Sequence, residues 1–346
     1  MISFSNRLIK WHKKSGRKNL PWQIKTTPYK VWISEIMLQQ TQVNTVKPYF
    51  KRFIERYPSA TEIAMSSQEE IMTYWSGLGY YSRAKNIHLS ALIITERFKG
   101  LLPMSLDDLI NLPGIGRSTA GAIMSLGHKK SAPILDSNAR RVLCRYKAVK
   151  GDLLKSKTNK ELWTIAESLL PKENASIYTQ ALMDLGATIC LQKNPKCLEC
   201  PINTICLAKK ENLIHSIPQK KIRKLKPTKE VYWLIIRSLK GEYLLTKRPN
   251  TGIWPGLWCF FQFNNLKEIG TSNKILKGIN IPTKKEYKLI KHSFSHYTLH
   301  AKPICIDLKK KEMQTSDKLL WLKVKNIDSH GLPTPVKKTI VELSSK

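Results

Sequence analysis

The chain has 346 residues, enough for two domains with separate cores, and its hydrophobic share of 42% argues against a globally disordered protein. Lys and Arg number 59 against 25 acidic residues, giving a formal net charge of +34. This excess predicts a polyanionic partner such as a nucleic acid, although the composition also points to an AT-rich genome. The first residues hold no signal-peptide core and no run of about eighteen apolar residues follows, so we expect a cytoplasmic protein without a membrane span.

Residues 1–215 are expected to be helical. Apolar residues recur there at three- and four-residue spacing, and Pro or Gly residues divide the segments, which predicts roughly ten helices. Residues 216–229 are expected to form a linker, because prolines frame this basic stretch. The linker either contacts DNA phosphates or is only a solvated connector. From residue 230 to 346 we expect an α+β domain, because β-branched and aromatic residues predict strands over 231–236, 243–246, 258–263 and 297–308, before a helix over 336–343.

A carboxylate lies in an apolar segment near the N-terminus. Within VWISEIML, residues 31–38, Glu35 shares a helix face with Val31, Trp32 and Leu38. Such neighbours desolvate a carboxylate and raise its pKa, so that it keeps a proton near neutral pH as a general acid must. The alternative is a Glu at the rim of a core helix, paired with a basic residue, and the residues alone favour that alternative.

A glycine-rich turn follows in the segment Leu112-Pro-Gly-Ile-Gly116. An apolar segment precedes the turn and a helix is expected to begin at Arg117, which predicts a helix–hairpin–helix over about 106–125. Backbone N–H groups of such a turn, with a helix N-terminus behind them, form a cradle for a phosphate. A plain turn that joins two helices is the alternative.

Asp136 stands directly before another expected helix. The simplest interpretation is an N-cap, although Ala139 occupies the position where a capping box requires Glu or Gln. The functional interpretation is an ionised carboxylate beneath a developing cation. Cleavage of an N-glycosidic bond creates an oxocarbenium-like sugar, and one acid with one carboxylate is the recurring solution to that reaction.

Four of the seven cysteines cluster in one segment with the spacing C-x6-C-x2-C-x5-C: Cys190, Cys197, Cys200 and Cys206. Four thiolates within seventeen positions can close on one metal ion or on a cube-shaped cluster, and the spacing leaves zinc and [4Fe–4S] both open. Neither predicts chemistry at the metal, because four protein ligands leave no open position. Lysines surround the loop, which favours an element that faces phosphates over a purely stabilising one.

Five motifs occur in order along the chain: LPW at 20–22, WISEIMLQQTQ at 32–42, GLGYY at 77–81, LPGIGRSTAG at 112–121 and ILD at 134–136. Together they closely resemble the MutY-type adenine DNA glycosylases of the helix–hairpin–helix superfamily, which includes endonuclease III. The resemblance covers nearly the whole chain. It implies an all-α helix–hairpin–helix glycosylase domain with a [4Fe–4S] loop over 190–206, held by the four clustered cysteines, and then an α+β Nudix-like domain.

The resemblance implies a role for each catalytic position. Glu35 would protonate adenine at N7, Asp136 would stabilise the sugar cation or attack it, and Asn138 would orient that site. Ser118 occupies the position that often carries a Lys nucleophile in strand-cutting relatives, and a neutral Ser cannot form the Schiff base that strand cleavage needs. A monofunctional enzyme that leaves an abasic site is therefore expected. The main alternative is an endonuclease III-like glycosylase and lyase acting on oxidised pyrimidines, which Ser118, Glu35 and the second domain oppose.

The resemblance also implies the DNA contacts. Trp22 would lie beside the adenine pocket, and Gln40 and Tyr80 would wedge into the base stack as adenine flips out. The hairpin would hold a phosphate at Leu112, Gly114 and Gly116. The implied substrate is double-stranded DNA with adenine opposite 8-oxoguanine or guanine, and the implied protein is a bacterial monomer associated with the nucleoid through DNA. A DNA-binding protein without activity would explain the charge, the hairpin and the metal loop, but would not need Glu35, Asp136 and an aromatic wedge together.

The C-terminal part resembles the Nudix-like domain with which this family recognises 8-oxoguanine. Phe294, Ser295 and His296 match its recognition loop, with Ser295 as a hydrogen-bond partner of the damaged base; a simple turn in a strand pair is the alternative. Nudix hydrolases hold Mg²⁺ with several clustered glutamates, whereas Glu268 stands isolated here. We therefore expect no nucleotide pyrophosphatase activity.

Overall fold

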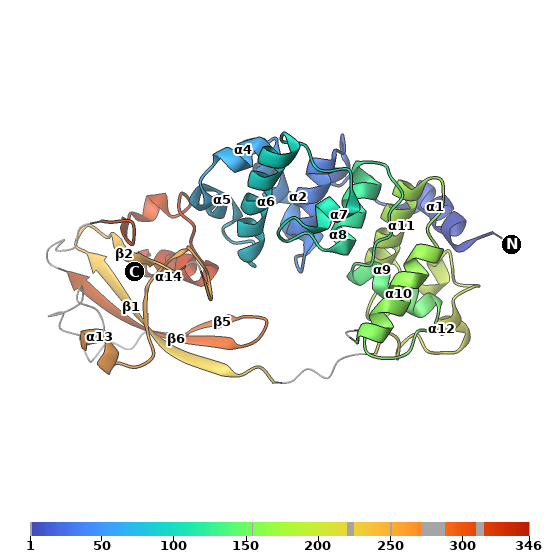
Figure 1. Cartoon of the computed structure of the whole chain (residues 1–346). Coiled ribbons are helices and arrows are strands. Elements are labelled where there is room, and N and C mark those ends of the chain that lie inside the picture. The colour runs from blue at the N-terminus through green and yellow to red at the C-terminus, as the bar shows by residue number, and fades with distance from the viewer. Residues whose placement is uncertain are drawn as a thin grey trace. The chain divides into compact units, whose positions relative to one another are not determined.

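The computed structural model describes residues 2–153, 155–219, 225–249, 251–271, 288–308 and 315–345. Residues 220–224 of the expected linker lie outside this part. The chain divides into two compact units, Met1–Met65 with Asn86–Arg223 and Ser66–Lys85 with Lys224–Lys346 (Figure 1). Among the described residues, no helix is long and apolar enough to cross a membrane.

Helices build the first unit, as expected. Their bounds are α1 (Phe4–Ser15), α2 (Pro28–Leu38), α3 (Val43–Arg56), α4 (Ala60–Met65), α7 (Leu106–Ile110), α8 (Arg117–Ala122), α9 (Ser137–Tyr146), α10 (Ser156–Ser168), α11 (Ala175–Thr188) and α12 (Leu207–Lys210). Helix α5 (Gln68–Trp75) belongs to the second unit, and α6 (Ser82–Phe98) begins there and continues into the first. The described part of residues 1–215 thus holds twelve α-helices, several of them too short to give a periodic pattern.

Local sequence signals explain where the helices near the site begin. Helix α2 starts at Pro28, and its N-cap Thr27 accepts a hydrogen bond from the backbone N–H of Lys30.

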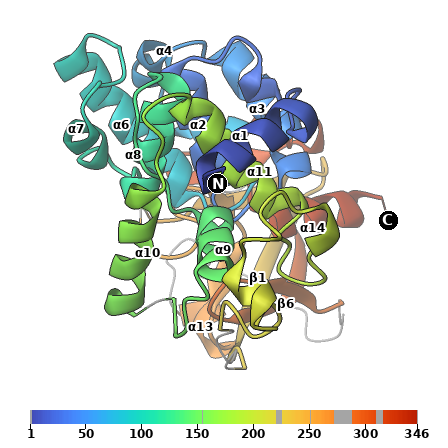
Figure 2. The ribbon, with the colours of Figure 1, turned by 90° about the vertical axis from the view of Figure 1, so that its right-hand side faces the viewer.

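Helices α1, α9, α10 and α11 bury their apolar faces in one core that includes Leu8, Leu143 and Leu162. Figure 2 shows α1 lying against α11 and α9 beside α10. This core holds the N-terminal end of α9 and the length of α11 in fixed places.

A seven-stranded sheet builds most of the second unit. Its strands are β1 (Thr228–Ser238), β2 (Tyr243–Lys247), β3 (Trp258–Cys259), β4 (Phe261–Phe263), β5 (Ile290–Ser293), β6 (Thr298–Leu308) and β7 (Leu319–Leu322). The order is β3-β2-β1-β6-β5, while β4 pairs with β1 and β7 with β2. Strands β1 and β6 are parallel, in register from Thr228 opposite Thr298 to Ser238 opposite Leu308 (Figure 1).

The strand predictions hold with three differences, and one of them is that β7 was not expected. The expected strand over 258–263 is two short strands that separate at Phe260 and pair with different neighbours, β3 with β2 and β4 with β1. Strand β5 was not expected, because its residues IKHS alternate between half-buried and exposed and carry two basic side chains. The expected closing helix lies within α14 (Thr334–Ser344), and α13 (Lys267–Thr271) is a short helix after β4.

Candidate active site

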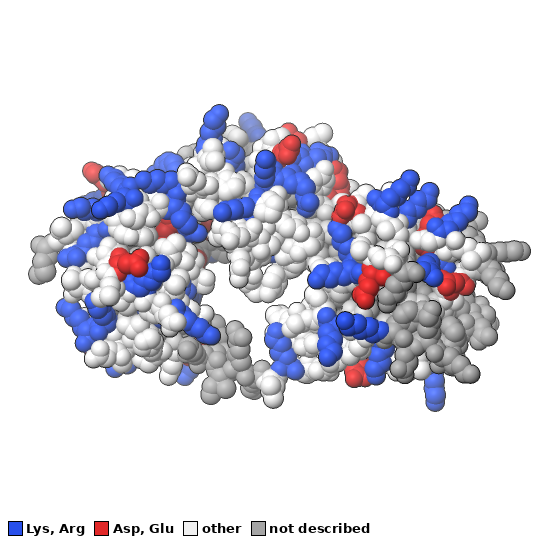
Figure 3. All heavy atoms as spheres, turned by 180° about the vertical axis from the view of Figure 1, so that it is seen from behind, with Lys and Arg blue, Asp and Glu red and all other residues white. Residues whose placement is uncertain are grey.

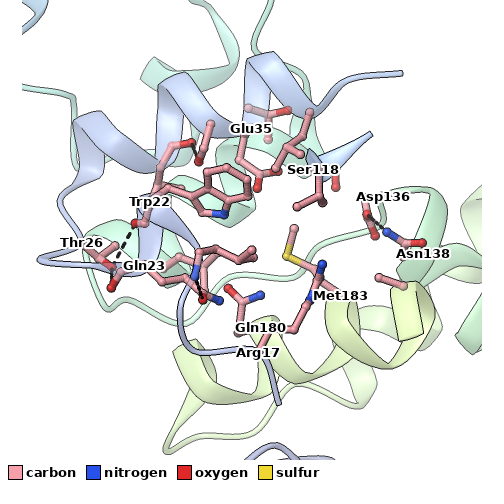
Figure 4. Close-up of a pocket in the computed structure, with 18 of the residues that line it drawn as sticks. Arg17, Trp22, Gln23, Thr26, Glu35, Ser118, Asp136, Asn138, Gln180 and Met183 are labelled. Atoms are coloured by element: carbon pink, nitrogen blue, oxygen red, sulfur yellow. Dashed lines mark hydrogen bonds between the residues drawn. The ribbon is translucent and has the colours of Figure 1, made fainter. Parts of the chain in front are cut away.

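A cavity of about 990 Å³ opens in the first unit. Its walls come from the turn at Pro21–Gln23, from α2 and the loop after it, from the start of α8, from residues 136–138 and from α11. In Figure 4 the side chains of Trp22, Glu35 and Ser118 face a common space, with Met183 of α11 reaching into it and Asp136 beside Asn138 at its side. All three residues that the sequence singled out for catalysis therefore line one cavity.

Glu35 lies in the second half of α2 and lines this cavity. Its neighbours Val31, Trp32 and Ile36 are buried, because α2 presents apolar residues on nearly every side. Burial, and after it the negative charge of Asp136, raise the pKa of Glu35 to about 8. The side chain therefore carries a proton at neutral pH, which is the state that a general acid needs.

Asp136 is both the N-cap of α9 and a wall of the cavity. Its Oδ1 accepts a hydrogen bond from the backbone N–H of Ala139 at 2.7 Å, and its Oδ2 accepts one from Asn138 Nδ2 at 3.3 Å (Figure 4). Burial raises the pKa of Asp136, and the hydrogen bonds from Ala139 and Asn138 and the charge of Arg141 oppose that rise. The cap thus supplies N–H groups that favour the ionised carboxylate.

Asn138 is held from two sides. Arg141 Nη2 donates to Asn138 Oδ1 at 2.9 Å, which turns the amide so that its nitrogen faces Asp136. Arg141 Nε also donates to the carbonyl of Cys190 at 2.7 Å. Helix α11 approaches so closely that a Cβ on Gly186 would lie 2.6 Å from Asn138 Cβ. Only glycine allows this approach, because real Cβ atoms do not come so near.

Ser118 lies near Asp136, in the first turn of the helix that follows the hairpin. Ser118 Oγ accepts a hydrogen bond from the backbone N–H of Leu135 at 3.0 Å, next to the carboxylate. The hairpin joins α7 to α8; Gly114 has φ of +80°, and a Cβ there would lie 2.9 Å from Asn86 Cβ. Gly116 is the N-cap of α8 and has open space at its Cα. The Leu112 side chain is 3% exposed, so a DNA contact at this position would involve its backbone.

The two expected wedge residues share an unusual backbone conformation. Gln40 has a φ of +58° and Tyr80 has a φ of +50°. Both values lie in the left-handed region, which residues other than glycine rarely adopt. Gln40 lies in the loop after α2 and lines the cavity, whereas Tyr80 belongs to the second unit and is 44% exposed. Strained residues of this kind cluster at ligand-binding sites.

Trp22 lies in the wall of the cavity, and its ring is fixed by an edge contact with Phe50, 5.5 Å between centroids. Three further lining residues, Arg17, Gln180 and Met183, were not expected from the sequence.

Arg17 and Gln180 are held by a carboxylate that the sequence analysis missed. Asp184 of α11 has no exposed surface, and it accepts three hydrogen bonds from Arg17 and one from Gln180. Burial alone would raise the pKa of Asp184, but His12 and Arg17 hold it below its usual range. An acidic residue inside the apolar run ALMDL, residues 181–185, was the available signal.

The four clustered cysteines line one small cavity beside α9: Cys190, Cys197, Cys200 and Cys206. The guanidinium of Arg145, 2% exposed, donates to Cys190 Sγ at 3.4 Å. Burial raises the pKa of Cys200 to about 12, and the other three thiols add to the rise because they lie near it. Within the described residues, no three His, Cys, Asp or Glu side chains are grouped as a single metal ion would require.

The expected recognition loop is the turn between β5 and β6. The backbone N–H of Phe294 donates to Tyr297 O at 2.9 Å, which closes the turn and leaves Ser295 and His296 exposed at its tip. The Phe294 ring packs against Trp254, with centroids 5.2 Å apart. Lys226, from the expected linker, donates to the carbonyl of Phe294 at 2.6 Å. The segment is thus a turn in a strand pair whose polar side chains reach solvent.

Comparison with known proteins finds a family match for the helical part of the chain and another for the part that contains the sheet. Residues 33–168 match the HhH-GPD superfamily of base excision DNA repair proteins, and residues 232–342 match the NUDIX domain. The adenine DNA glycosylase of Buchnera aphidicola subsp. Acyrthosiphon pisum (strain APS) is 44% identical over 97% of this chain and 96% of its own length. The chain belongs to the adenine DNA glycosylase family. The human adenine DNA glycosylase is 31% identical over 75% of this chain and 57% of its own length.

Solved structures agree with the fold of the helical part. A thermostable thymine-DNA glycosylase is 28% identical with a TM-score of 0.55, and covers 60% of this chain and 95% of its own. Endonuclease III in a non-covalent DNA complex is 23% identical with a TM-score of 0.52, over 60% of this chain and 94% of its own, and this likeness concerns the fold alone. The expected fold class, a helix–hairpin–helix glycosylase domain followed by a Nudix-like domain, is confirmed.

Proposed function

We propose that the chain is a monofunctional adenine DNA glycosylase of base excision repair. It hydrolyses the N-glycosidic bond of adenine opposite 8-oxoguanine or guanine and leaves an abasic site. Two relatives named adenine DNA glycosylase match almost the full length of the chain. The observation that carries the proposal is the pair of carboxylates in one cavity, with Glu35 protonated near neutral pH and Asp136 held by N–H donors.

The two carboxylates divide the chemistry of base release. Adenine is a poor leaving group as an anion, so Glu35 donates its proton to ring nitrogen N7 as the bond to the sugar lengthens. Asp136, in its ionised form, stabilises the positive charge that develops on the sugar, and Asn138 keeps this carboxylate oriented. Water completes the reaction. Ser118 has no amine to form a Schiff base, so the strand stays intact.

Several features of the surface suit duplex DNA as the substrate. On the face in Figure 3, Lys and Arg side chains spread over the surface and greatly outnumber the acidic ones, in line with the net charge of +34. Gly114 and Gly116 place backbone N–H groups at the start of α8, where a phosphate binds. The exposed Tyr80 ring and Gln40 fill the gap that the flipped adenine leaves. The protein binds DNA as a monomer.

The turn between β5 and β6 reads the base opposite adenine. Ser295 and His296 are exposed at its tip, where their polar groups can reach a base edge, and Phe294 anchors the turn on Trp254. The carboxylate of Glu268 accepts hydrogen bonds from Asn264 and Asn265 and serves local structure at the start of α13. This domain therefore acts in recognition and not in nucleotide hydrolysis.

The four clustered cysteines hold a [4Fe–4S] cluster. All four residues line one cavity, and Arg145 places positive charge beside it, which suits a set of thiolates. When bound, the cluster supplies structural support to the loop, because four thiolates occupy its protein-ligand positions. Substitution of Cys200→Ser should lower iron and inorganic sulfide per purified chain and weaken visible absorption, whereas Cys305→Ser, on β6, should not. Equal iron in both variants would refute the assignment.

The experiment that tests the proposed function is base release from two labelled duplexes. One carries adenine opposite 8-oxoguanine and the other carries thymine glycol, and each is analysed with and without alkali. We expect the adenine strand to break only after alkali, because the product is an abasic site. Cleavage of the thymine-glycol strand without alkali would instead establish the glycosylase and lyase alternative.

A further inference from the structure

Helix α5 and the sheet of the second unit are joined by one carboxylate. Glu69, in the first turn of α5, accepts a hydrogen bond from Lys247 Nζ of β2 at 2.6 Å and one from Trp258 Nε1 of β3 at 2.8 Å. Lys247 also lies over the Trp258 ring, 5.2 Å from its centroid. Each oxygen of Glu69 thus binds a different strand, which fixes both the position and the rotation of the start of α5.

The end of α5 is attached to the same unit by other contacts. Ser76 Oγ, directly after α5, donates to the carbonyl of Leu332 at 2.9 Å, and the hydroxyl of Tyr81 donates to it at 3.4 Å. A Cβ on Gly331 would lie 3.4 Å from Met72 Cβ, so the backbone before α14 packs directly on the helix. Helix α5 is therefore held at both ends by residues from the C-terminal half of the chain.

The same segment controls the backbone of the expected wedge residue. Trp75 Nε1, in the last turn of α5, donates to Gly79 O at 3.1 Å, and Arg83 Nη2 donates to the same oxygen at 3.0 Å. The Arg83 guanidinium lies 5.2 Å from the Trp75 ring and 5.4 Å from the Tyr80 ring. A displacement of α5 would therefore move Gly79 and the adjacent Tyr80, both of which have a left-handed backbone.

One loop connects Glu69 to the β5–β6 turn. The Phe294 ring packs on Trp254, and the carbonyl of Trp254 accepts from the backbone N–H of Leu257 at 3.2 Å, one residue before Trp258. Trp258 in turn donates its indole N–H to Glu69. The loop from 254 to 258 thus contacts the turn at one end and α5 at the other.

We propose that Glu69 is a positioning residue that links the base bound at the β5–β6 turn to the insertion of Tyr80. Its two hydrogen bonds hold α5 to β2 and β3, so that ordering of the turn by a damaged base steadies the wedge on the adenine side. The residue acts on the preference between opposite bases and touches no reacting atom. This inference rests on the proposed function, because it assumes that Tyr80 enters DNA and that the turn reads the opposite base.

The test is a comparison of single-turnover adenine release from duplexes with 8-oxoguanine or guanine opposite adenine. Glu69→Ala should lower the ratio of the two rates about tenfold, an amount equal to ~1.4 kcal/mol of coupling. Glu69→Gln should restore part of the ratio, since its amide oxygen still accepts from Trp258. The matched control is Glu230→Ala, which removes an exposed ion pair with Lys302 from the same sheet and should leave the ratio unchanged.

A second pair of measurements separates positioning from stability. Lys247→Met breaks the same ion pair from the strand side and should lower the rate ratio even if Glu69→Ala folds poorly. The double variant Glu69→Ala with Ser295→Ala should lose less activity on the 8-oxoguanine duplex than the two single variants predict when their losses are added as free energies. Both substitutions interrupt the same connection between the turn and Tyr80, so the second has less to remove. The proposal would be overturned if Glu69→Ala slowed adenine release equally on both duplexes, or if the losses of Glu69→Ala and Ser295→Ala were additive in the double variant. A wild-type protein that releases no adenine would instead refute the proposed function and would be evident before any variant is made.

Discussion

The cavity in the first unit and the β5–β6 turn in the second unit use polar groups in opposite ways. In the cavity, burial raises the pKa of Glu35 and of Asp136, and Asp136 also accepts hydrogen bonds from Ala139 and Asn138. At the turn, Ser295 and His296 are exposed and bind each other at 3.3 Å. Acid catalysis needs a raised proton affinity, which burial and a neighbouring charge provide, whereas recognition of a base needs groups that can exchange water for the ligand. Substitutions in the two regions should therefore affect different quantities.

The largest expected effect concerns the cavity. Glu35→Gln should lower single-turnover adenine release about 10²–10⁴-fold, because an amide cannot supply the proton. Binding to the mismatched duplex, measured by fluorescence anisotropy, should stay unchanged, and Glu96→Gln, an exposed change on α6, should behave as the wild type. Release by Glu35→Gln at the wild-type rate would mean that Glu35 is not the acid.

The second expected effect is a pH dependence that belongs to the cavity alone. Burial and then Asp136 raise the pKa of Glu35 to about 8, so the catalytic proton is present below this pH and is lost above it. The rate of base release should therefore fall about tenfold per unit as pH rises beyond 8. In Asp136→Asn the decline of the residual activity with rising pH should begin at a lower pH than in the wild type. The negative charge that raises the pKa of Glu35 is absent from this variant. A rate that stays constant from pH 7 to 10 would contradict this assignment.

The smallest expected effect concerns the turn. Ser295→Ala removes one hydrogen bond to the opposite base, which is worth about 0.5–1.5 kcal/mol, or roughly a 2–10-fold change in rate. The loss should appear with 8-oxoguanine opposite adenine and not with guanine. Ser293→Ala, a neighbouring exposed change on β5, serves as the control. An equal loss on both duplexes would show that Ser295 does not distinguish the two bases.

The sequence predicted well those features that depend on neighbouring residues. The helix around Glu35, the hairpin and the cap at Asp136 all follow from local pattern and turn chemistry. At Asp136 the sequence offered an N-cap and a functional carboxylate as alternatives. The two are compatible, because the carboxylate that caps α9 also lines the cavity.

Features that depend on distant contacts could not be predicted from the sequence. The packing of α5 on the sheet brings Glu69 to Lys247, and the role of Asp184 depends on Arg17 from the start of the chain. The parallel pairing of β1 with β6 likewise joins segments about seventy residues apart. No periodic pattern encodes such contacts, since each side chain looks like an ordinary helix or strand residue in its own segment.

Gly186 has no side chain and no reactive group, yet it lies against Asn138 at a distance that no other residue could keep. One added methyl group there would push Asn138 from Asp136 or move α11, which also carries Gln180 and Met183 in the wall of the cavity. The mutational tolerance of this position is therefore tied both to the geometry around Asp136 and to the packing of α11 on α9. A residue without a side chain thus holds a catalytic carboxylate in place by leaving room for Asn138.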